Sequence, residues 1–411
     1  MPRSSSIARS SPATRPASAP ADGAALRLAP PYARAALESL VARYGSPLFV
    51  IDCDQLRAQY RRLAAALPGV ALHYALKPLP QPIVVATLAD LGSGFDVATS
   101  GEIDLVRAAQ VTPQRCIHTH PIKRDADIRD ALRFGIRTFV ADNPDELGKF
   151  VRHRQRAELL LRIAFRSPDA VCDLSRKFGC EPQAVPELLA LALRLGVRVV
   201  GLSFHVGSQV SSPAGYVRAI EACGALMAAA RAAGTAELTT LDIGGGFPVD
   251  YGAGAPEIAG FCAPIRAALA RLPAGLRLLA EPGRYLAAPA GLVLATVVGR
   301  AERDGRWWYY LDDGVYGSFS GQLCDHARYP VDSLRDDGPR SPSVLAGPTC
   351  DSIDVIAEDV ALPRLEIGDL VVGRMMGAYT SASASDFNFI RRARVVPVNV
   401  AVDAAVAELG R

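Results

Sequence analysis

The chain has 411 residues, of which 50% are hydrophobic and 21% charged, and this balance excludes wholesale disorder. Its 45 basic and 42 acidic residues give a net charge of +3, without the basic block that a nucleic-acid-binding surface needs. No apolar run is long enough to cross a bilayer, so we expect no membrane partner. The eight cysteines are scattered, with no CxxC pair, which favours a reducing, cytoplasmic compartment and argues against structural zinc.

The first segment, residues 1–26, consists largely of Ser, Pro, Ala and Arg. This composition cannot form an apolar core, and its frequent proline opposes an amphipathic transit helix, so we predict a disordered tail. Residues 27–45 are predicted to add a strand to a β-rich domain encoded further along the chain. A short strand at 47–52 and a helix at about 54–66 follow.

Residues 46–285 alternate between short β-rich runs and longer helical stretches. The strand-like runs lie near residues 70–76, 93–99, 115–119, 137–142, 158–165, 198–206, 239–243 and 277–281. Such alternation is typical of βαβ units with a parallel sheet, and eight units close into a (β/α)₈ TIM-type barrel. An open doubly wound sheet is the alternative, but it rarely carries eight successive parallel strands.

The pattern of the sequence changes after residue 285. Across residues 286–411 helical patterns almost vanish, and strand-like runs such as 307–311 and 369–372 are separated by loops with Asp-Gly and Gly-Pro pairs. The predicted fold class is therefore α/β, a (β/α)₈ barrel followed by a C-terminal β-barrel or sandwich domain.

Polar residues at the ends of the predicted barrel strands are the candidates for an active site, because barrel sites lie at the C-terminal ends of the strands. The first run ends in Lys77, which fits a Schiff-base lysine as well as a lysine that reaches solvent. The seventh leads into Gly244–Gly246, whose backbone N–H groups could hold an anion such as phosphate. The eighth ends in Glu281 and Arg284, either a surface ion pair or separate binding groups for a cation and a phosphate.

Histidines and two further polar residues lie at other strand ends. His205, at the end of the sixth run, points to the same barrel mouth, and Asp96 and Arg162 belong to the second and fifth runs. His118 and His120 stand two residues apart on one strand face. Because no carboxylate or third histidine lies nearby in the sequence, we predict no metal site.

Taken in order, these motifs resemble the fold-type III pyridoxal-phosphate decarboxylases, and most closely the eukaryotic-type ornithine decarboxylases. The resemblance covers about residues 45–395. Beyond the barrel it includes the motifs 312–319, 325–326, 347–352, 376–380 and 387–388.

The resemblance implies pyridoxal 5′-phosphate as cofactor, and Lys77, His205, Glu281 and Cys350 as catalytic residues. The cofactor-binding residues it implies are Lys77, Asp96, Arg162, His205, Ser208, Gly244, Gly245, Gly246, Glu281, Arg284 and Tyr379. The implied substrate-binding residues are Tyr316, Asp325, Asp351 and Phe387. It also implies a homodimer in which Cys350 reaches the site of the other subunit.

The reaction implied is decarboxylation of a basic diamino acid, L-ornithine to putrescine or lysine to cadaverine, with release of CO₂. Diaminopimelate is an alternative substrate, but Asp325 suits a distal ammonium better than a second carboxylate. An N-substituted diamino acid of siderophore biosynthesis is another, because Cys324 stands where the family has an aromatic residue. A racemase would not need the Cys350-Asp351 loop. An inactive regulatory homologue would be expected to lose Lys77, Cys350 or the phosphate-binding groups, which this chain keeps.

Overall fold

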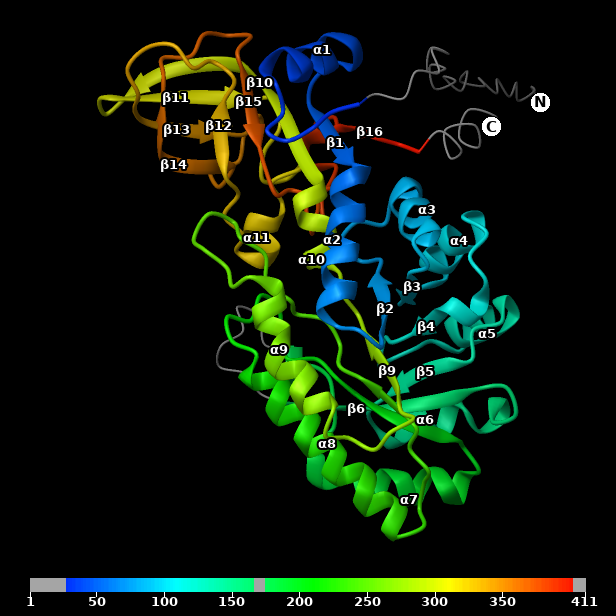
Figure 1. Cartoon of the computed structure of the whole chain (residues 1–411). Coiled ribbons are helices and arrows are strands. Elements are labelled where there is room, and N and C mark those ends of the chain that lie inside the picture. The colour runs from blue at the N-terminus through cyan, green and yellow to red at the C-terminus, as the bar shows by residue number, and fades with distance from the viewer. Residues whose placement is uncertain (1–26, 166–173, 402–411) are drawn as a thin grey trace, which may run out of the picture.

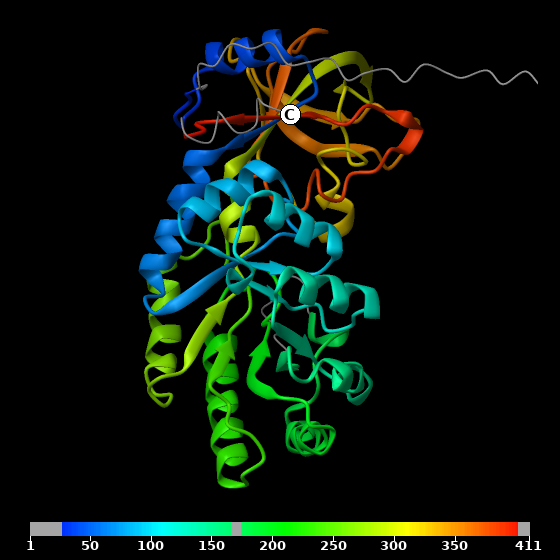
Figure 2. The same cartoon turned by 90° about the vertical axis from the view of Figure 1, so that its right-hand side faces the viewer.

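The computed structural model describes residues 27–165 and 174–401, which form two lobes stacked along the long axis of the molecule (Figure 1). The predicted disordered tail, residues 1–26, lies outside the described residues. The lower lobe is a barrel and the upper lobe is a mostly β-sheet domain, with strand β10 running up from the barrel into the sheets. Both views show the barrel mouth facing the upper lobe (Figure 2).

The lower lobe is a closed barrel of parallel strands, as predicted. Its strands are β2 (Val70–Ala75), β3 (Gly94–Val97), β4 (Cys116–His118), β5 (Thr138–Ala141), β6 (Glu158–Ile163), β7 (Val199–Phe204), β8 (Thr240–Asp242) and β9 (Arg277–Ala280). Each strand pairs in parallel with the next, and β2 closes the ring against β9. The strands are short and largely buried, which is why they read as continuous apolar runs rather than alternating ones.

Helices cover the outside of the barrel. They are α2 (Cys53–Ala66), α3 (Pro82–Asp90), α4 (Ser100–Ala108), α5 (Asp125–Phe134), α6 (Pro144–Lys149), α7 (Val185–Leu195), α8 (Ala214–Ala232) and α9 (Ile258–Leu269). Helix α2 precedes the first barrel strand and packs against α3 and α9, which completes the ring. Its first turn is capped by Asp52, whose Oδ1 accepts a hydrogen bond of 2.9 Å from the Asp54 N–H. The short helix α10 (Arg284–Ala287) leads out of the barrel.

The upper lobe contains β-strands from both ends of the chain. They are β1 (Leu48–Asp52), β10 (Gly291–Arg303), β11 (Arg306–Leu311), β12 (Val331–Ser333), β13 (Ser341–Ala346), β14 (Val355–Leu362), β15 (Leu370–Gly373) and β16 (Arg394–Val398). The main order is β12-β15-β10-β11-β13-β14, and β1 pairs with both β10 and β16. The short helix α11 (Gly321–Asp325) lies between this lobe and the barrel.

The strand predicted within residues 27–45 is wrong. Residues Arg34–Tyr44 form helix α1, whose Leu37 and Leu40 pack on the apolar side of the β1–β10–β16 sheet. The three-residue spacing of these leucines is helical, whereas a strand would place alternate residues on one face. The strand that joins the upper lobe is β1, which the sequence-based boundary had assigned to the barrel.

Candidate active site

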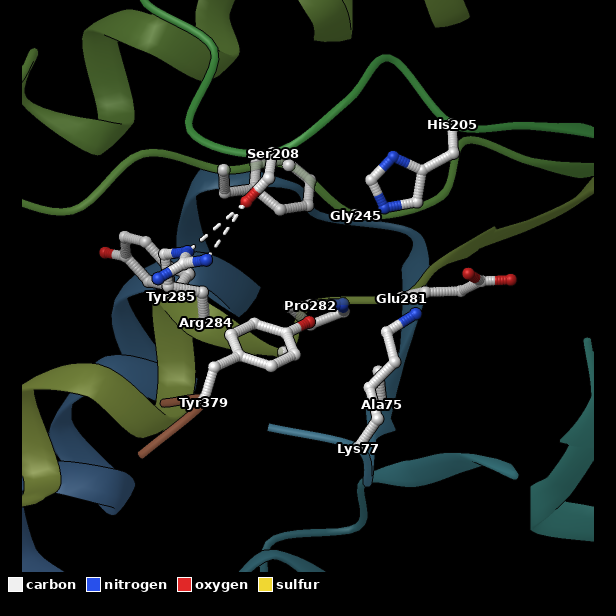
Figure 3. Close-up of a pocket in the computed structure, with 13 residues that line it drawn as sticks. Ala75, Lys77, His205, Ser208, Gly245, Glu281, Pro282, Arg284, Tyr285 and Tyr379 are labelled. Carbon is white, nitrogen blue, oxygen red and sulfur yellow. Dashed lines mark hydrogen bonds between the residues drawn. The ribbon is translucent and has the colours of Figure 1, made fainter. Parts of the chain in front are cut away.

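Polar side chains from several strand ends surround one cavity at the barrel mouth (Figure 3). Lys77 follows β2, His205 follows β7, and Glu281 follows β9. The cavity is lined by Ala75, Lys77, His205, Ser208, Gly245, Gly246, Phe247, Glu281, Pro282, Gly283, Arg284, Tyr285 and Tyr379. All but Tyr379 come from the barrel or the turn that leaves it. The convergence follows from the fold, because parallel strands bring their C-terminal ends to one rim.

Barrel residues surround Lys77, but its side chain extends into the open cavity at the barrel mouth. The side chain is therefore exposed to solvent through that cavity. Burial favours the neutral amine, but Tyr379 and the Asp96 and Glu281 carboxyl groups outweigh it and raise the pKa of Lys77. Asp96 does not line the cavity; it lies behind Lys77, buried, and accepts a hydrogen bond from Thr119 Oγ1. Lys77 is therefore an amine that is held close to carboxyl groups and lines the cavity where a ligand can reach it.

Gly244, Gly245 and Gly246 form a bare backbone turn beside the cavity. Gly244 has φ +66° and Gly246 φ +116°, backbone conformations that L side chains rarely adopt. A Cβ on either residue would also lie 2.3 Å from a carbonyl oxygen of the neighbouring β7 loop. The turn thus needs glycine. Gly245 and Gly246 line the cavity and can present main-chain groups to an anion, whereas Gly244 does not line it and its N–H donates to Asp242 Oδ1.

Arg284 lies at the same end of the cavity as this turn. Its Nε and Nη2 each lie 3.3 Å from Ser208 Oγ, and its Nη1 donates to the Tyr251 hydroxyl at 2.9 Å. The guanidinium also stacks on the Tyr379 ring, 4.9 Å from its centroid, and pairs with the Asp325 carboxylate. A guanidinium, a hydroxyl and a glycine turn at one end of a cavity form a site suited to a phosphate group.

His205 provides a flat ring above the cavity. Its Nδ1 accepts a hydrogen bond of 3.0 Å from the Gly207 N–H, so this nitrogen carries no proton. Burial, together with the charges of Arg162 and Lys77, lowers the pKa of His205 well below its usual value. The ring is therefore neutral and suited to stacking on an aromatic ligand.

Glu281 marks the end of the cavity opposite Arg284 (Figure 3). It is 8% exposed, and burial, followed by the nearby Asp242 and Asp96, raises its pKa well above the usual value. Arg162 does not line the cavity, but its charge lies close enough to be stabilised by Glu281 and Asp96. The site is thus polarised, with a phosphate-binding end and a carboxyl end.

A second group of predicted residues lies apart from this cavity, on the upper lobe. The Tyr316 hydroxyl donates to Asp351 Oδ2 at 2.5 Å, and the Tyr316 and Phe387 rings stack with centroids 4.3 Å apart. Cys350 is exposed, and its Sγ accepts a hydrogen bond of 3.1 Å from Asn388 Nδ2. None of these residues is among those that line the Lys77 cavity. One chain therefore holds two separate clusters rather than one complete set.

His118 and His120 face different surroundings. His118 is buried against Phe139, with no hydrogen bond to either ring nitrogen, while His120 packs edge-on against Phe178. Across residues 27–165 and 174–401, no three His, Cys, Asp or Glu side chains form a group that could hold a metal ion.

Sequence reasoning missed two residues of the site. Tyr251 hydrogen-bonds Arg284 from a loop after β8, and Asp242 lies at the end of β8, in contact with Glu281. A strand-end acid two residues before three successive glycines was a usable signal for Asp242. Tyr251 carries no comparable signal, because it is an isolated residue in a Gly- and Pro-rich loop.

The residues present fit pyridoxal phosphate. A reactive amine, a phosphate-binding end, a stacking ring and a carboxyl group at the far end match the aldehyde, phosphate, ring faces and ring nitrogen of that cofactor. The geometry thus defines a lysine-dependent (β/α)₈ barrel for a phosphorylated aromatic cofactor.

Comparison with known proteins agrees with this geometry. The family described as pyridoxal-dependent decarboxylase, pyridoxal binding domain, matches residues 53–288. A lysine/ornithine decarboxylase from Vibrio vulnificus, solved with putrescine, is 52% identical, with a TM-score of 0.87 over 91% of this chain and 100% of that one. A lysine/ornithine decarboxylase from Selenomonas ruminantium is 37% identical over 86% of this chain and 89% of its own. Antizyme inhibitor 2 of Xenopus laevis is 37% identical over 84% of this chain and 80% of its own.

The chain belongs to the pyridoxal-dependent decarboxylase family and is a carboxy-lyase that uses pyridoxal phosphate. In the part of the chain that the structure describes, no helix is both long and apolar enough to cross a membrane.

Proposed function

We propose that the enzyme decarboxylates L-ornithine to putrescine, and lysine to cadaverine, with release of CO₂. The observation that carries the proposal is Asp325, a carboxylate from α11 that is half-buried beside the cavity and paired with Arg284. Of the residues that line the cavity, Arg284 is the only arginine, and Ser208 and Tyr251 already bind it. The site therefore offers an anion for a distal ammonium group and lacks a free guanidinium for a distal carboxylate. The named activities of the Vibrio and Selenomonas relatives support this choice.

Each residue of the cavity would have a defined task. The bound cofactor supplies an electron sink for the electron pair left behind when CO₂ departs. Lys77 attaches the cofactor through its amine, and His205 stacks on the ring. Ser208, Arg284 and the glycine turn bind the phosphate, and Tyr379 packs over Arg284. Glu281 holds a proton at the ring nitrogen, while Asp96 and Arg162 support Lys77 and Glu281 from behind.

We also propose a homodimer in which the second cluster serves the cavity of the other subunit. Four apolar side chains near Cys350 and α11 are exposed: Leu323 at 43%, Ile353 at 52%, Phe387 at 40% and Phe389 at 96%. Exposed aromatic and aliphatic groups gathered near polar site residues are typical of an interface. Cys350 of the partner subunit would then deliver a proton to the carbon that lost CO₂. Asp351 of the partner subunit would bind the distal ammonium together with Asp325.

Mixed dimers test the shared site. Lys77→Ala is expected to be inactive and Cys350→Ala to be strongly impaired, whereas co-expression should raise activity well above either variant, because one site of a mixed dimer keeps both residues. Native mass spectrometry confirms that mixed dimers form. Mixed dimers without recovered activity would show that both residues act within one chain.

Substrate identity is tested by CO₂ release from the cofactor-loaded enzyme with ornithine, lysine, arginine and meso-diaminopimelate, and the amine products are identified by mass spectrometry. Putrescine and cadaverine are expected as the main products. Preferred turnover of diaminopimelate would contradict the role of Asp325. An N-substituted diamino acid is included because Cys324, next to Asp325, is small and exposed; turnover of that compound alone would favour the second substrate class.

The free cysteines of the described residues fit a reducing compartment, and we propose a cytoplasmic location. Fractionation of cells that express the tagged chain tests this.

A further inference from the structure

Asp242 is a buried carboxyl group of the site for which the proposed function has no role. It ends strand β8 and is 0% exposed. Its Oδ1 accepts a hydrogen bond of 2.9 Å from the Gly244 N–H, whereas its Oδ2 has no hydrogen bond of ordinary geometry. A buried carboxylate oxygen without a donor is costly, so a proton or a partner is expected on that side.

The group that Asp242 meets is another carboxyl, that of Glu281. The Glu281 N–H donates to the Gly244 carbonyl at 2.8 Å, and Gly244 in turn donates to Asp242, so one turn holds both residues. The two buried carboxyl groups are close enough for each to influence the pKa of the other. Two ionised carboxylates in contact and away from water repel each other, whereas one shared proton converts the contact into a hydrogen bond.

The charges around the pair also favour a bound proton. Asp96 is the third buried carboxyl group facing the pair, and Lys77 and Arg162 are the facing cations. His205 is neutral and adds no charge. These three carboxyl groups outnumber the two cations, so ionisation of all three would leave excess negative charge in a buried site. Asp142 also faces Arg162, but it is half-buried and accepts hydrogen bonds from the Gly179 N–H and Asn143 Nδ2.

We propose that Asp242 is a positioning residue that shares one buried proton with Glu281 and so holds Glu281 ready to pair with the cofactor's ring nitrogen. This inference rests on the proposed role of Glu281. Burial raises both pKa values, that of Asp242 to about 6 and that of Glu281 well above its usual value. Both shifts favour the protonated form, so the pair holds a proton more readily than two exposed carboxyl groups would.

When the cofactor is bound, the Asp242 charge lies behind Glu281. The negative charge of Asp242 raises the proton affinity of Glu281 and of the ring nitrogen bound to it. A proton between Glu281 and the ring nitrogen is therefore favoured. Asp242 would thus act through Glu281, without touching substrate.

The shared proton is tested first on the cofactor-free protein by infrared spectroscopy. A buried carboxylic acid gives a C=O band that is distinct from carboxylate bands, and wild type is expected to show it at neutral pH. Asp242→Asn keeps the oxygen that accepts from Gly244 but removes one acid, so two carboxyl groups face two cations and the band should vanish. Glu281→Gln should also abolish it, whereas the control Asp142→Asn should leave it unchanged. A band that persists in Asp242→Asn, or is missing from wild type, overturns the proposal.

The second test is ¹⁵N NMR of protein loaded with ring-¹⁵N pyridoxal phosphate. Asp242→Asn is expected to move the ring-nitrogen shift toward the unprotonated value at neutral pH, and Asp142→Asn is not. An unchanged shift in Asp242→Asn would overturn the part assigned to Asp242. Failure of the proposed function would appear instead as no turnover of any diamino acid, and the infrared result would stand.

Discussion

The two clusters of predicted site residues differ in how complete each is within one chain. The barrel cluster is enclosed: Glu281, His205 and Arg284 are each at most 8% exposed, and they meet around Lys77. The upper-lobe cluster lies open, with Cys350 and Phe387 both exposed. A cofactor-binding site needs fixed groups that are shielded from water, and the barrel of one chain can supply all of them. The groups proposed to bind substrate and deliver a proton are open to solvent in one chain, and the proposed homodimer would cover them.

The largest expected loss of activity comes from a substitution in the barrel cluster. Lys77→Ala should abolish turnover and the covalent link to the cofactor, because no other amine lines the cavity. Borohydride reduction followed by peptide mass spectrometry measures the link. Lys77→Arg keeps the positive charge without a nucleophilic amine and should also lack it. Cofactor found covalently attached in Lys77→Ala would remove this residue from the site.

The next largest effect should distinguish the two clusters, because a change in the upper-lobe cluster should reduce turnover without reducing cofactor binding. Cys350→Ala should lower kcat by about 10²–10⁴-fold, the usual contribution of a general acid, while the cofactor stays bound. Cofactor affinity is measured by fluorescence titration and kcat by CO₂ release. Cys324→Ser, at a second exposed cysteine of the described residues, is the control and should keep near-normal kcat. Equal losses in both variants would show that general loss of structure, not proton delivery, explains Cys350→Ala.

Sequence reasoning located the barrel cluster because buried parallel strands read as apolar runs and their ends converge on one rim. Lys77, Glu281 and the glycine turn could therefore be grouped without coordinates. The pairing of Arg284 with Asp325 could not be predicted in this way, since it joins residues 41 positions apart and belonging to two lobes. Helix α1 was missed although Leu37 and Leu40 carry the helical spacing, because these two are the only buried residues of its eleven and give a weak apolar pattern.

Asp325 links the two clusters and should have an intermediate effect. Asp325→Asn removes the charge offered to the distal ammonium, and a charged hydrogen bond contributes about 1.5–3 kcal/mol. KM for ornithine and lysine is therefore expected to rise about 10- to 100-fold, at roughly 1.4 kcal/mol per tenfold. Steady-state kinetics on both substrates measures this. Asp336→Asn, on an exposed loop of the upper lobe, should leave KM unchanged. An unchanged KM in Asp325→Asn would place the ammonium elsewhere.

The smallest effect concerns acid stability, which should differ between the lobes. Burial lowers the pKa of His118 to about 3 and that of His73 to about 4, and both lie on barrel strands. In the unfolded chain these side chains titrate near 6.5, so below that pH the unfolded state binds more protons than the folded one. The contribution of these two neutral histidines to the free energy of unfolding is fully present above a pH of about 6.5. It is lost as the pH falls toward their pKa values in the folded protein.

At a pH of about 5.5, each of these histidines should lower the free energy of unfolding by about 1.4 kcal/mol relative to neutral pH. His118→Leu is therefore expected to lower the acid sensitivity of the cofactor-free protein, since it also removes two ring nitrogens that lack hydrogen bonds. Urea unfolding between neutral pH and mild acid measures this slope. His326→Gln, at an exposed histidine of the upper lobe, should retain the wild-type slope. An identical slope in His118→Leu would mean that acid destabilises the protein through other groups, and the barrel would lose its distinction from the upper lobe in this respect.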